Sequence, residues 1–207
     1  MIRSPATDTD NYKGPMFVDF GGPGLPGTLS LASKSSPLRA DAFAEALSGY
    51  DLVTFDSRGV GNTLPAVSCF NTEEDRLAFT DSVGDFSVGQ SIDAFIIDDA
   101  RNRLLSASCA ENAADLLPYI GTAYAVEDLR RMVEAYGYSD KLSFMYVFCT
   151  IQVFYRQALT TSLNSGLSYG SLLGMTYAAT YPDKVERLIL DCTYSHSSYK
   201  TYLRRNC

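Results

Sequence analysis

The sequence predicts an α/β fold built on a doubly wound, mostly parallel β-sheet. Short apolar segments of strand length alternate with longer segments of helical periodicity along the 207 residues. Glycine-rich loops follow two of the strand segments, at residues 21–24 and 56–61. A third glycine-containing turn, at residues 166–170, leads into a stretch of small and apolar residues at helical spacing. Strands and helices in alternation are typical of a parallel sheet covered by helices on both faces.

The order of elements follows from these signals. We expect, in sequence, a lead-in loop (1–14), a strand (15–20), a helix (41–47), a strand (50–55), surface helix and loop (70–100), two helices (103–117 and 122–136), a strand (142–145), a helix after residue 170, and a strand (185–190).

Proline, glycine and helix-capping residues at the ends of these segments support this order. The first 14 residues are polar and contain Pro5 and Gly14, which argues for a loop. Gly49 follows the 41–47 segment as a helix-ending residue. The segment 122–136 starts at Thr122, a good N-cap, and Gly137 follows it at the position that favours a left-handed backbone.

The loop at residues 21–24 has the sequence Gly-Gly-Pro-Gly and directly follows a strand. Glycines allow backbone N–H groups to approach a ligand closely. Pro23 has no N–H to donate, so Gly21, Gly22, Gly24 or Leu25 has to supply any contact to a negatively charged oxygen. An ordinary turn at the end of a strand is the simpler alternative.

The turn at residues 166–170 reads Gly-Leu-Ser-Tyr-Gly, a G-x-S-x-G nucleophile elbow. Gly166 and Gly170 leave room for the tight turn, and Ser168 stands at the start of a helix. The N–H groups and the dipole of a helix start favour developing negative charge. Ser168 is therefore the candidate nucleophile, and the N–H of Tyr169 is a candidate oxyanion donor.

Composition excludes several classes of function. The formal net charge is −7 and no basic run occurs, which argues against nucleic acid as a partner. The longest apolar run, residues 142–155, is too short to span a bilayer. The chain does not open with a signal-peptide pattern, so the sequence as written predicts a cytoplasmic protein, or a secreted one if its N-terminus is incomplete. Oligomeric state is not indicated.

The cysteines and the histidine predict no metal site and no cofactor. The five cysteines contain no C-x-x-C pair, and one histidine cannot complete a zinc site with them. Cys69 and Cys109 form a candidate disulfide if the compartment is oxidising. The odd number of cysteines argues against a fully disulfide-bonded framework and leaves the redox compartment open.

Three motifs in this order, at 21–24, 56–61 and 166–170, resemble the α/β-hydrolases of the prolyl iminopeptidase and tripeptidyl aminopeptidase group. The resemblance implies a serine hydrolase with Ser168 as nucleophile and an oxyanion hole formed by Tyr169 N–H and an N–H of the Gly21–Gly24 loop, in which Gly21 and Gly22 are the candidate site residues. Its implied substrates are peptides with a free N-terminus, or esters as in some relatives. Arg58 in the second motif is expected to brace loops rather than to react.

The sequence departs from this group after the last expected strand. The group carries its acid and histidine well beyond that strand, after a helical cap, so we interpret residues 1–207 as a partial hydrolase domain without the cap and late strands. Within the chain, Asp191 is a candidate acid and His196, the single histidine, a candidate base; loop residues without a catalytic role are the alternative for both. We expect this chain to be inactive as written. An esterase or lipase, or a non-catalytic binding protein, are alternative functions.

The second departure is a segment at residues 146–165, between the 142–145 strand and the elbow. A strand should run into the elbow serine almost without a spacer, and removing these twenty residues restores that arrangement. The genetic code allows splice-like sequences at both ends of the segment. We therefore hypothesise an aberrant insertion of retained-intron origin, with a lineage-specific loop as the alternative.

Overall fold

The computed structural model describes residues 1–33, 45–81, 91–146 and 169–190. These residues form two compact units. The first combines residues 1–64 with the described residues from 122 onward, and the second comprises residues 65–121. The first unit contains the sheet and the predicted site, and the second is helical.

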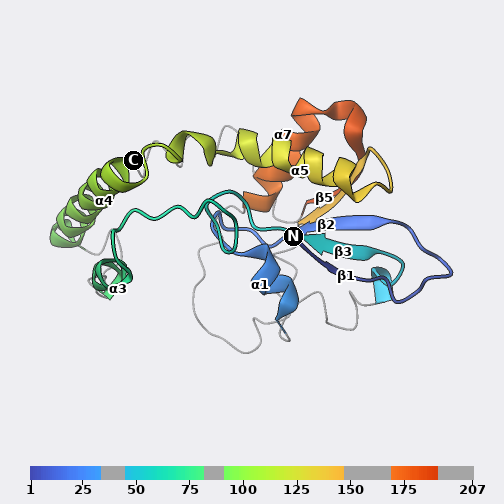
Figure 1. Ribbon diagram of the computed structural model, residues 1–207, viewed down its shortest axis with the longest axis horizontal. Coiled ribbons are helices and arrows are strands. Elements are labelled where there is room, and N and C mark those ends of the chain that lie inside the picture. The colour runs from blue at the N-terminus through green and yellow to red at the C-terminus, as the bar shows by residue number, and fades with distance from the viewer. Residues whose placement is uncertain (34–44, 82–90, 147–168, 191–207) are drawn as a thin grey trace. The chain divides into compact units, whose positions relative to one another are not determined.

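A five-stranded sheet organises the first unit (Figure 1). Its spatial order is β1-β3-β2-β4-β5. The strands are β1 (Ile2–Ser4), β2 (Pro15–Asp19), β3 (Asp51–Thr54), β4 (Leu142–Tyr146) and β5 (Val185–Leu190). β1 pairs with β3 in antiparallel fashion, whereas the other neighbouring pairs are parallel. The predicted mostly parallel sheet is confirmed.

Helices α5 (Thr122–Tyr136) and α7 (Tyr169–Thr180) cover one face of the sheet (Figure 1). Alternate side chains of the strands point to this face, among them Phe17 of β2 and Phe144 of β4, both essentially inaccessible to solvent. They pack against the stripe of α5 that contains Val126 and Leu129, and against Leu173 of α7. The core of the unit therefore lies between the sheet and these two helices.

The opposite face of the sheet carries a smaller core. Met16 and Val18 of β2 flank Phe17 in sequence and therefore point to this other face, where Met145 of β4 joins them. Leu31 of helix α1 (Gly27–Ala32) packs on them. Helices on both faces confirm the doubly wound arrangement.

Small residues in α7 allow this helix to lie close to the sheet. A Cβ added at Gly174 would stand 2.7 Å from Leu190 Cδ2 of β5 and 3.0 Å from Phe144 Cε1 of β4. A larger residue would hold the helix away from both strands. The run of small residues after the elbow is thus explained by close helix–sheet packing.

Two of the expected elements are corrected in the first unit. The lead-in segment is not entirely loop, because Ile2–Ser4 forms β1, whose residues pair with 52–54 at the edge of the sheet. Helix α1 was not among the expected elements, although Pro26 stands at its N-cap. Strand β4 also extends to Tyr146, which the sequence analysis assigned to the insertion; the remaining residues, 147–165, lie outside the described residues.

The second unit contains α3 (Glu73–Asp81), α4 (Ile92–Asn112) and the short 3₁₀ helix η2 (Leu117–Tyr119). The predicted helix 103–117 is therefore wrong in its bounds. It begins eleven residues earlier, where the Ser91 side chain accepts a hydrogen bond from Ala94 N, and ends at Asn112. No helix in the described parts of the chain is long and apolar enough to cross a membrane.

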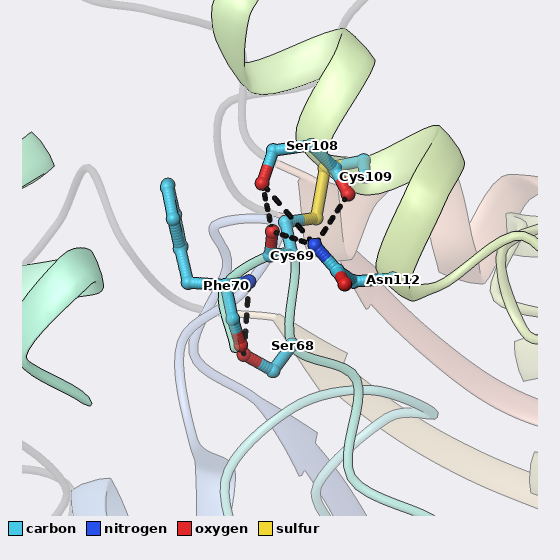
Figure 2. Close-up of a disulfide and its surroundings, with 6 residues drawn as sticks. All are labelled: Ser68, Cys69, Phe70, Ser108, Cys109 and Asn112. Atoms are coloured by element: carbon cyan, nitrogen blue, oxygen red, sulfur yellow. Dashed lines mark hydrogen bonds between the residues drawn. A yellow bond between two sulfur atoms is a disulfide. The ribbon is translucent and has the colours of Figure 1, made fainter. Parts of the chain in front are cut away.

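A disulfide between Cys69 and Cys109 links the loop before α3 to the last turns of α4 (Figure 2). The predicted pairing is confirmed. Side chains of α4 hold the same loop: Ser108 Oγ and Asn112 Nδ2 both donate to the carbonyl oxygen of Cys69, the latter at 3.2 Å. The covalent link is thus reinforced by hydrogen bonds to the backbone of one of its cysteines.

Candidate active site

The parallel strands β2, β3 and β4 end at the same edge of the sheet. The loop of residues 21–24 leaves β2 there, and the loop of residues 56–61 follows β3. Ligands of open α/β sheets bind outside this carboxyl edge. The two motif-bearing loops of the described residues therefore lie at the sheet edge where such ligands bind.

The 21–24 loop depends on its glycines. Gly21, Gly22 and Gly24 have positive φ angles of 90°, 115° and 97°, a region that favours glycine. A Cβ added at Gly22 would lie 2.7 Å from the backbone nitrogen of Gly24 and 3.0 Å from that of Leu25. A side chain at Gly22 would therefore be both strained and in contact with the backbone nitrogens that follow it.

The backbone donors of this loop fall into two classes. Gly21 is buried, and its N–H donates to Asp19 Oδ1 at 2.7 Å. Gly22, Gly24 and Leu25 are exposed, and their N–H groups donate to no acceptor within the described residues. Among the described residues, three backbone donors of the loop thus have no acceptor, whereas the fourth is occupied.

Asp19 brings the end of β2 into contact with the start of α7. A Cβ added at Gly170, the second residue of α7, would lie 2.7 Å from Asp19 Oδ1 and would clash with the ring of Tyr146. Asp19 and Tyr146 are also register partners in the β2–β4 pair. Burial raises the pKa of Asp19 to about 6, although the hydrogen bond from Gly21 N–H opposes this shift.

Asp56 connects the two motif loops. Its carboxylate accepts hydrogen bonds from Thr28 N at 2.8 Å, from Thr28 Oγ1 at 2.7 Å and from Asn62 N at 3.0 Å. Thr28 lies in the first turn of α1, directly after the 21–24 loop. Desolvation would raise the pKa of Asp56, but these hydrogen bonds outweigh it and hold the pKa below its usual value.

Arg58 extends this brace to α5. Its Nε and Nη2 donate to the two carboxylate oxygens of Asp128 at 2.5 and 2.8 Å, and its guanidinium lies 5.2 Å from the centre of the Tyr124 ring. The geometry agrees with the expected bracing role of Arg58. The described residues contain no cluster of three or more histidine, cysteine or acidic side chains placed to hold a metal ion.

The predicted site residues are only partly visible in the structure. Gly21 and Gly22 lie in the loop after β2, and Tyr169 is the first residue of α7. The candidate nucleophile Ser168, the candidate acid Asp191 and the candidate base His196 lie outside the described residues. The structure thus describes the loop of residues 21–24 and helix α7, which begins inside the 166–170 turn.

Sequence reasoning overlooked Asp19 and gave Asp56 no role of its own. A signal for Asp19 was present, because an aspartate two residues before a glycine can accept that glycine's N–H and start a turn. Thr28, which donates hydrogen bonds to Asp56, is 28 residues away from it in sequence, and no local pattern indicates this contact.

A doubly wound, mostly parallel sheet with a glycine-rich loop at its carboxyl edge is an architecture typical of α/β enzymes. A profile of the alpha/beta hydrolase fold matches residues 22–204. The chain therefore belongs to the alpha/beta hydrolase fold family.

Three relatives with known names are similar to this chain in sequence. The chain is 27% identical over 197 residues to the tripeptidyl aminopeptidase of Streptomyces coelicolor, which covers 94% of this chain and 31% of that protein. It is 27% identical over 192 residues to the serine protease Hip1 of Mycobacterium tuberculosis, covering 92% of this chain and 31% of Hip1. It is 30% identical over 136 residues to carboxylesterase B of the same species, covering 65% and 24%. The chain thus spans about a third or less of each relative.

Proposed function

We propose that the protein is a serine hydrolase of the aminopeptidase type, in which Ser168 attacks a peptide carbonyl and forms an acyl-enzyme. In this proposal Tyr169 N–H and one of the unoccupied N–H groups of the 22–25 loop stabilise the oxyanion. Removal of one such donor typically lowers the rate by about 10²–10³-fold. One observation carries the proposal: the backbone N–H groups of Gly22, Gly24 and Leu25 have no acceptor among the described residues. They lie at the sheet edge where α7 begins with Tyr169, the residue that follows Ser168.

The proposed substrates are short peptides with a free N-terminus, because relatives named as an aminopeptidase and a serine protease match more than nine-tenths of the chain. An esterase is the second candidate, since carboxylesterase B is 30% identical over part of it. Both reactions use the same acyl-enzyme chemistry and differ in the leaving group, an amine or an alcohol.

We further propose that the 207-residue chain does not turn over substrate by itself. A serine hydroxyl needs a positioned base to react at neutral pH. The single histidine, His196, follows Ser168 by 28 positions, just after the last described strand, where some hydrolases carry an acid rather than the base.

The test compares the 207-residue chain with the product of the sequenced mature transcript. Both are treated with a fluorophosphonate probe, with Ser168→Ala as the matched control, and assayed with tripeptidyl arylamides and short-chain esters. We expect labelling and arylamide turnover in the transcript product, both lost in Ser168→Ala, and no turnover by the 207-residue chain.

Other outcomes point elsewhere. Turnover of short-chain esters without measurable arylamide turnover identifies the esterase, because a serine peptidase also hydrolyses the more reactive esters. Absence of labelling in both proteins rejects the hydrolase in favour of a binding protein. Turnover by the 207-residue chain that disappears in His196→Gln would make His196 the base.

A further inference from the structure

Asp19 is the only acidic side chain of β2, and it stands at the junction of three parts of the candidate site. It ends β2, it is the register partner of Tyr146 at the end of β4, and its carboxylate lies against Gly170 in the first turn of α7. The three sequence motifs assign it no role, because the first of them begins at Gly21.

Within the part of the chain that the structure describes, Asp19 is hydrogen-bonded to the backbone and has no charged partner. Its Oδ1 accepts from Gly21 N–H at 2.7 Å, two residues along the chain. Within the described residues, no cation contributes to its electrostatic environment. The titratable groups that the neighbouring elements bring are the phenols of Tyr146 on β4 and Tyr169 at the start of α7. A carboxylate in such a place is held for its hydrogen bond and not for an ion pair.

This hydrogen bond determines which N–H groups the loop offers. Gly21 has a φ of 90°, so the chain reverses direction immediately after the strand. A charge-assisted bond from a backbone N–H to a carboxylate is stronger than a neutral one and fixes this reversal. With Gly21 N–H turned toward Asp19, the exposed donors are those of Gly22, Gly24 and Leu25.

We propose that Asp19 is a positioning residue of the oxyanion loop: it holds Gly21 N–H at the end of β2 and thereby directs the following N–H groups to the reaction site. The proposal rests on the proposed hydrolase function, because the directed donors matter only if an oxyanion forms. Asp19 itself touches neither substrate nor nucleophile in this role. The Asp19–Gly21 bond, however, can be tested without any activity.

The first measurement follows the Gly21 amide of the 207-residue chain by NMR after selective labelling of glycine with ¹⁵N. The amide proton should shift as Asp19 titrates, with a midpoint raised above the ordinary aspartate pKa of about 3.9, toward about 6. Asp19→Asn should abolish this step, and Asp19→Ala should in addition speed hydrogen exchange of the Gly21 amide. Asp10→Asn, which changes an exposed acid of the first loop, should leave the step unchanged.

The second measurement uses the transcript product. Asp19→Ala should lower kcat about tenfold with little change in KM, the loss expected when one hydrogen bond of about 1.4 kcal/mol no longer orients a donor. Asp19→Asn keeps an acceptor oxygen and should recover most of kcat. Because Asn does not titrate, it should also remove any acid limb near pH 6 from the kcat profile. If Asp19 had only a structural role, Asp19→Ala would lower thermal stability, but it would not lower kcat selectively, and Asp19→Asn would not restore kcat.

The two measurements separate the two proposals. A Gly21 amide that shows no titration step, or whose step persists in Asp19→Asn, overturns the role of Asp19 whatever the activity. A Gly21 amide that titrates as expected in a protein that no fluorophosphonate labels overturns the hydrolase function, while the Asp19–Gly21 bond remains. Equal loss of kcat in Asp19→Asn and Asp19→Ala also contradicts the positioning role.

Discussion

Arg58 and Asp128, 70 residues apart in sequence, form a two-point ion pair that joins the loop after β3 to helix α5. The fork of the guanidinium meets both oxygens of the carboxylate, a geometry that lysine cannot reproduce. The pair is about one-third exposed on each side. Solvent screening therefore limits its contribution to stability.

We expect Arg58→Ala to lower the free energy of unfolding by about 1 kcal/mol, and Arg58→Lys to recover only part of that loss. Denaturant unfolding of both variants measures the difference. Arg103→Ala is the matched control, because Arg103 pairs with Asp99 on the exposed surface of α4 and its loss should have almost no effect. Full stability in Arg58→Lys would show that charge alone suffices.

Stability should be more sensitive to substitution of Asp56 than of Arg58, because the Asp56 carboxylate accepts three hydrogen bonds. Asp56→Ala leaves the buried Thr28 N–H and hydroxyl without their acceptor, and each unsatisfied group typically costs about 1–3 kcal/mol. We expect a loss of at least about 2 kcal/mol in denaturant unfolding. Thr63→Val, which removes one hydrogen bond to the Asp56 carbonyl from a partly exposed position, should lose less. Equal losses in both variants would argue against the carboxylate as the centre of this network.

Asp19 and Asp56 should make the free energy of unfolding depend on pH in opposite directions. The pKa of folded Asp19, about 6, lies above that of an unfolded aspartate, so its contribution is present below about pH 4 and is lost as pH rises toward 6. The pKa of folded Asp56 is lowered, so its contribution is present above about pH 4 and is lost as pH falls through the folded pKa.

Unfolding free energies of the wild type and Asp19→Asn between pH 4 and 7 isolate the first effect. The wild type should lose stability relative to Asp19→Asn over this range, and the difference should level off above pH 6. A constant difference between the two proteins would mean that Asp19 has an ordinary pKa.

Reduction of the Cys69–Cys109 disulfide should destabilise the helical unit of residues 65–121. The bond closes a loop with a sequence separation of 40, for which chain entropy predicts about 4 kcal/mol. Limited proteolysis should cut α3 and α4 sooner after reduction, whereas β2 and β4 should stay protected. A Cys69→Ala/Cys109→Ala variant should behave like the reduced protein and should not respond to reductant.

Deletion of residues 146–165 from the transcript product, if these residues are present there, should increase fluorophosphonate labelling of Ser168. In that variant Gly166 follows Met145 and replaces Tyr146, whose ring lies against Gly170 in the structure. Since misplacement of a nucleophile by about 1 Å can cost 10²-fold in rate, the gain should reach about that size.

The matched control is deletion of 147–165, which keeps Tyr146 and shifts the elbow by one residue relative to β4. A shift by one residue turns side chains to the other face of a strand, so this variant should not gain activity. An active parent protein whose 146–165 deletion fails to fold would establish the segment as a genuine part of the protein.

Much of the fold could be predicted from the sequence because its signals are local. Four strands and helix 122–136 were expected within one or two residues of their observed bounds, since apolar runs and Gly137 mark them. β1 was missed because a three-residue strand with one apolar side chain, Ile2, has no periodicity. The early start of α4 was missed although Ser91 is a good N-cap, because acids alternate with apolar residues there.

The candidate site was predictable only where it consists of backbone. The 21–24 loop and the start of α7 are determined by glycines that no side chain can replace, so the motifs indicate them. The partners of Arg58 and Asp56 depend on tertiary contacts with Asp128 and Thr28, which no spacing rule connects. The raised pKa of Asp19 likewise arises from burial by strands and a helix distant in sequence.

The disulfide also limits how far the chain can extend under force. If the protein were held by its two ends and stretched, the loop between Cys69 and Cys109 would bear no tension. About 140 Å of contour length, at roughly 3.5 Å for each of those residues, would stay hidden until the bond was reduced. A single-molecule force trace would therefore report the oxidation state of this one bond as a difference in the final length of the chain.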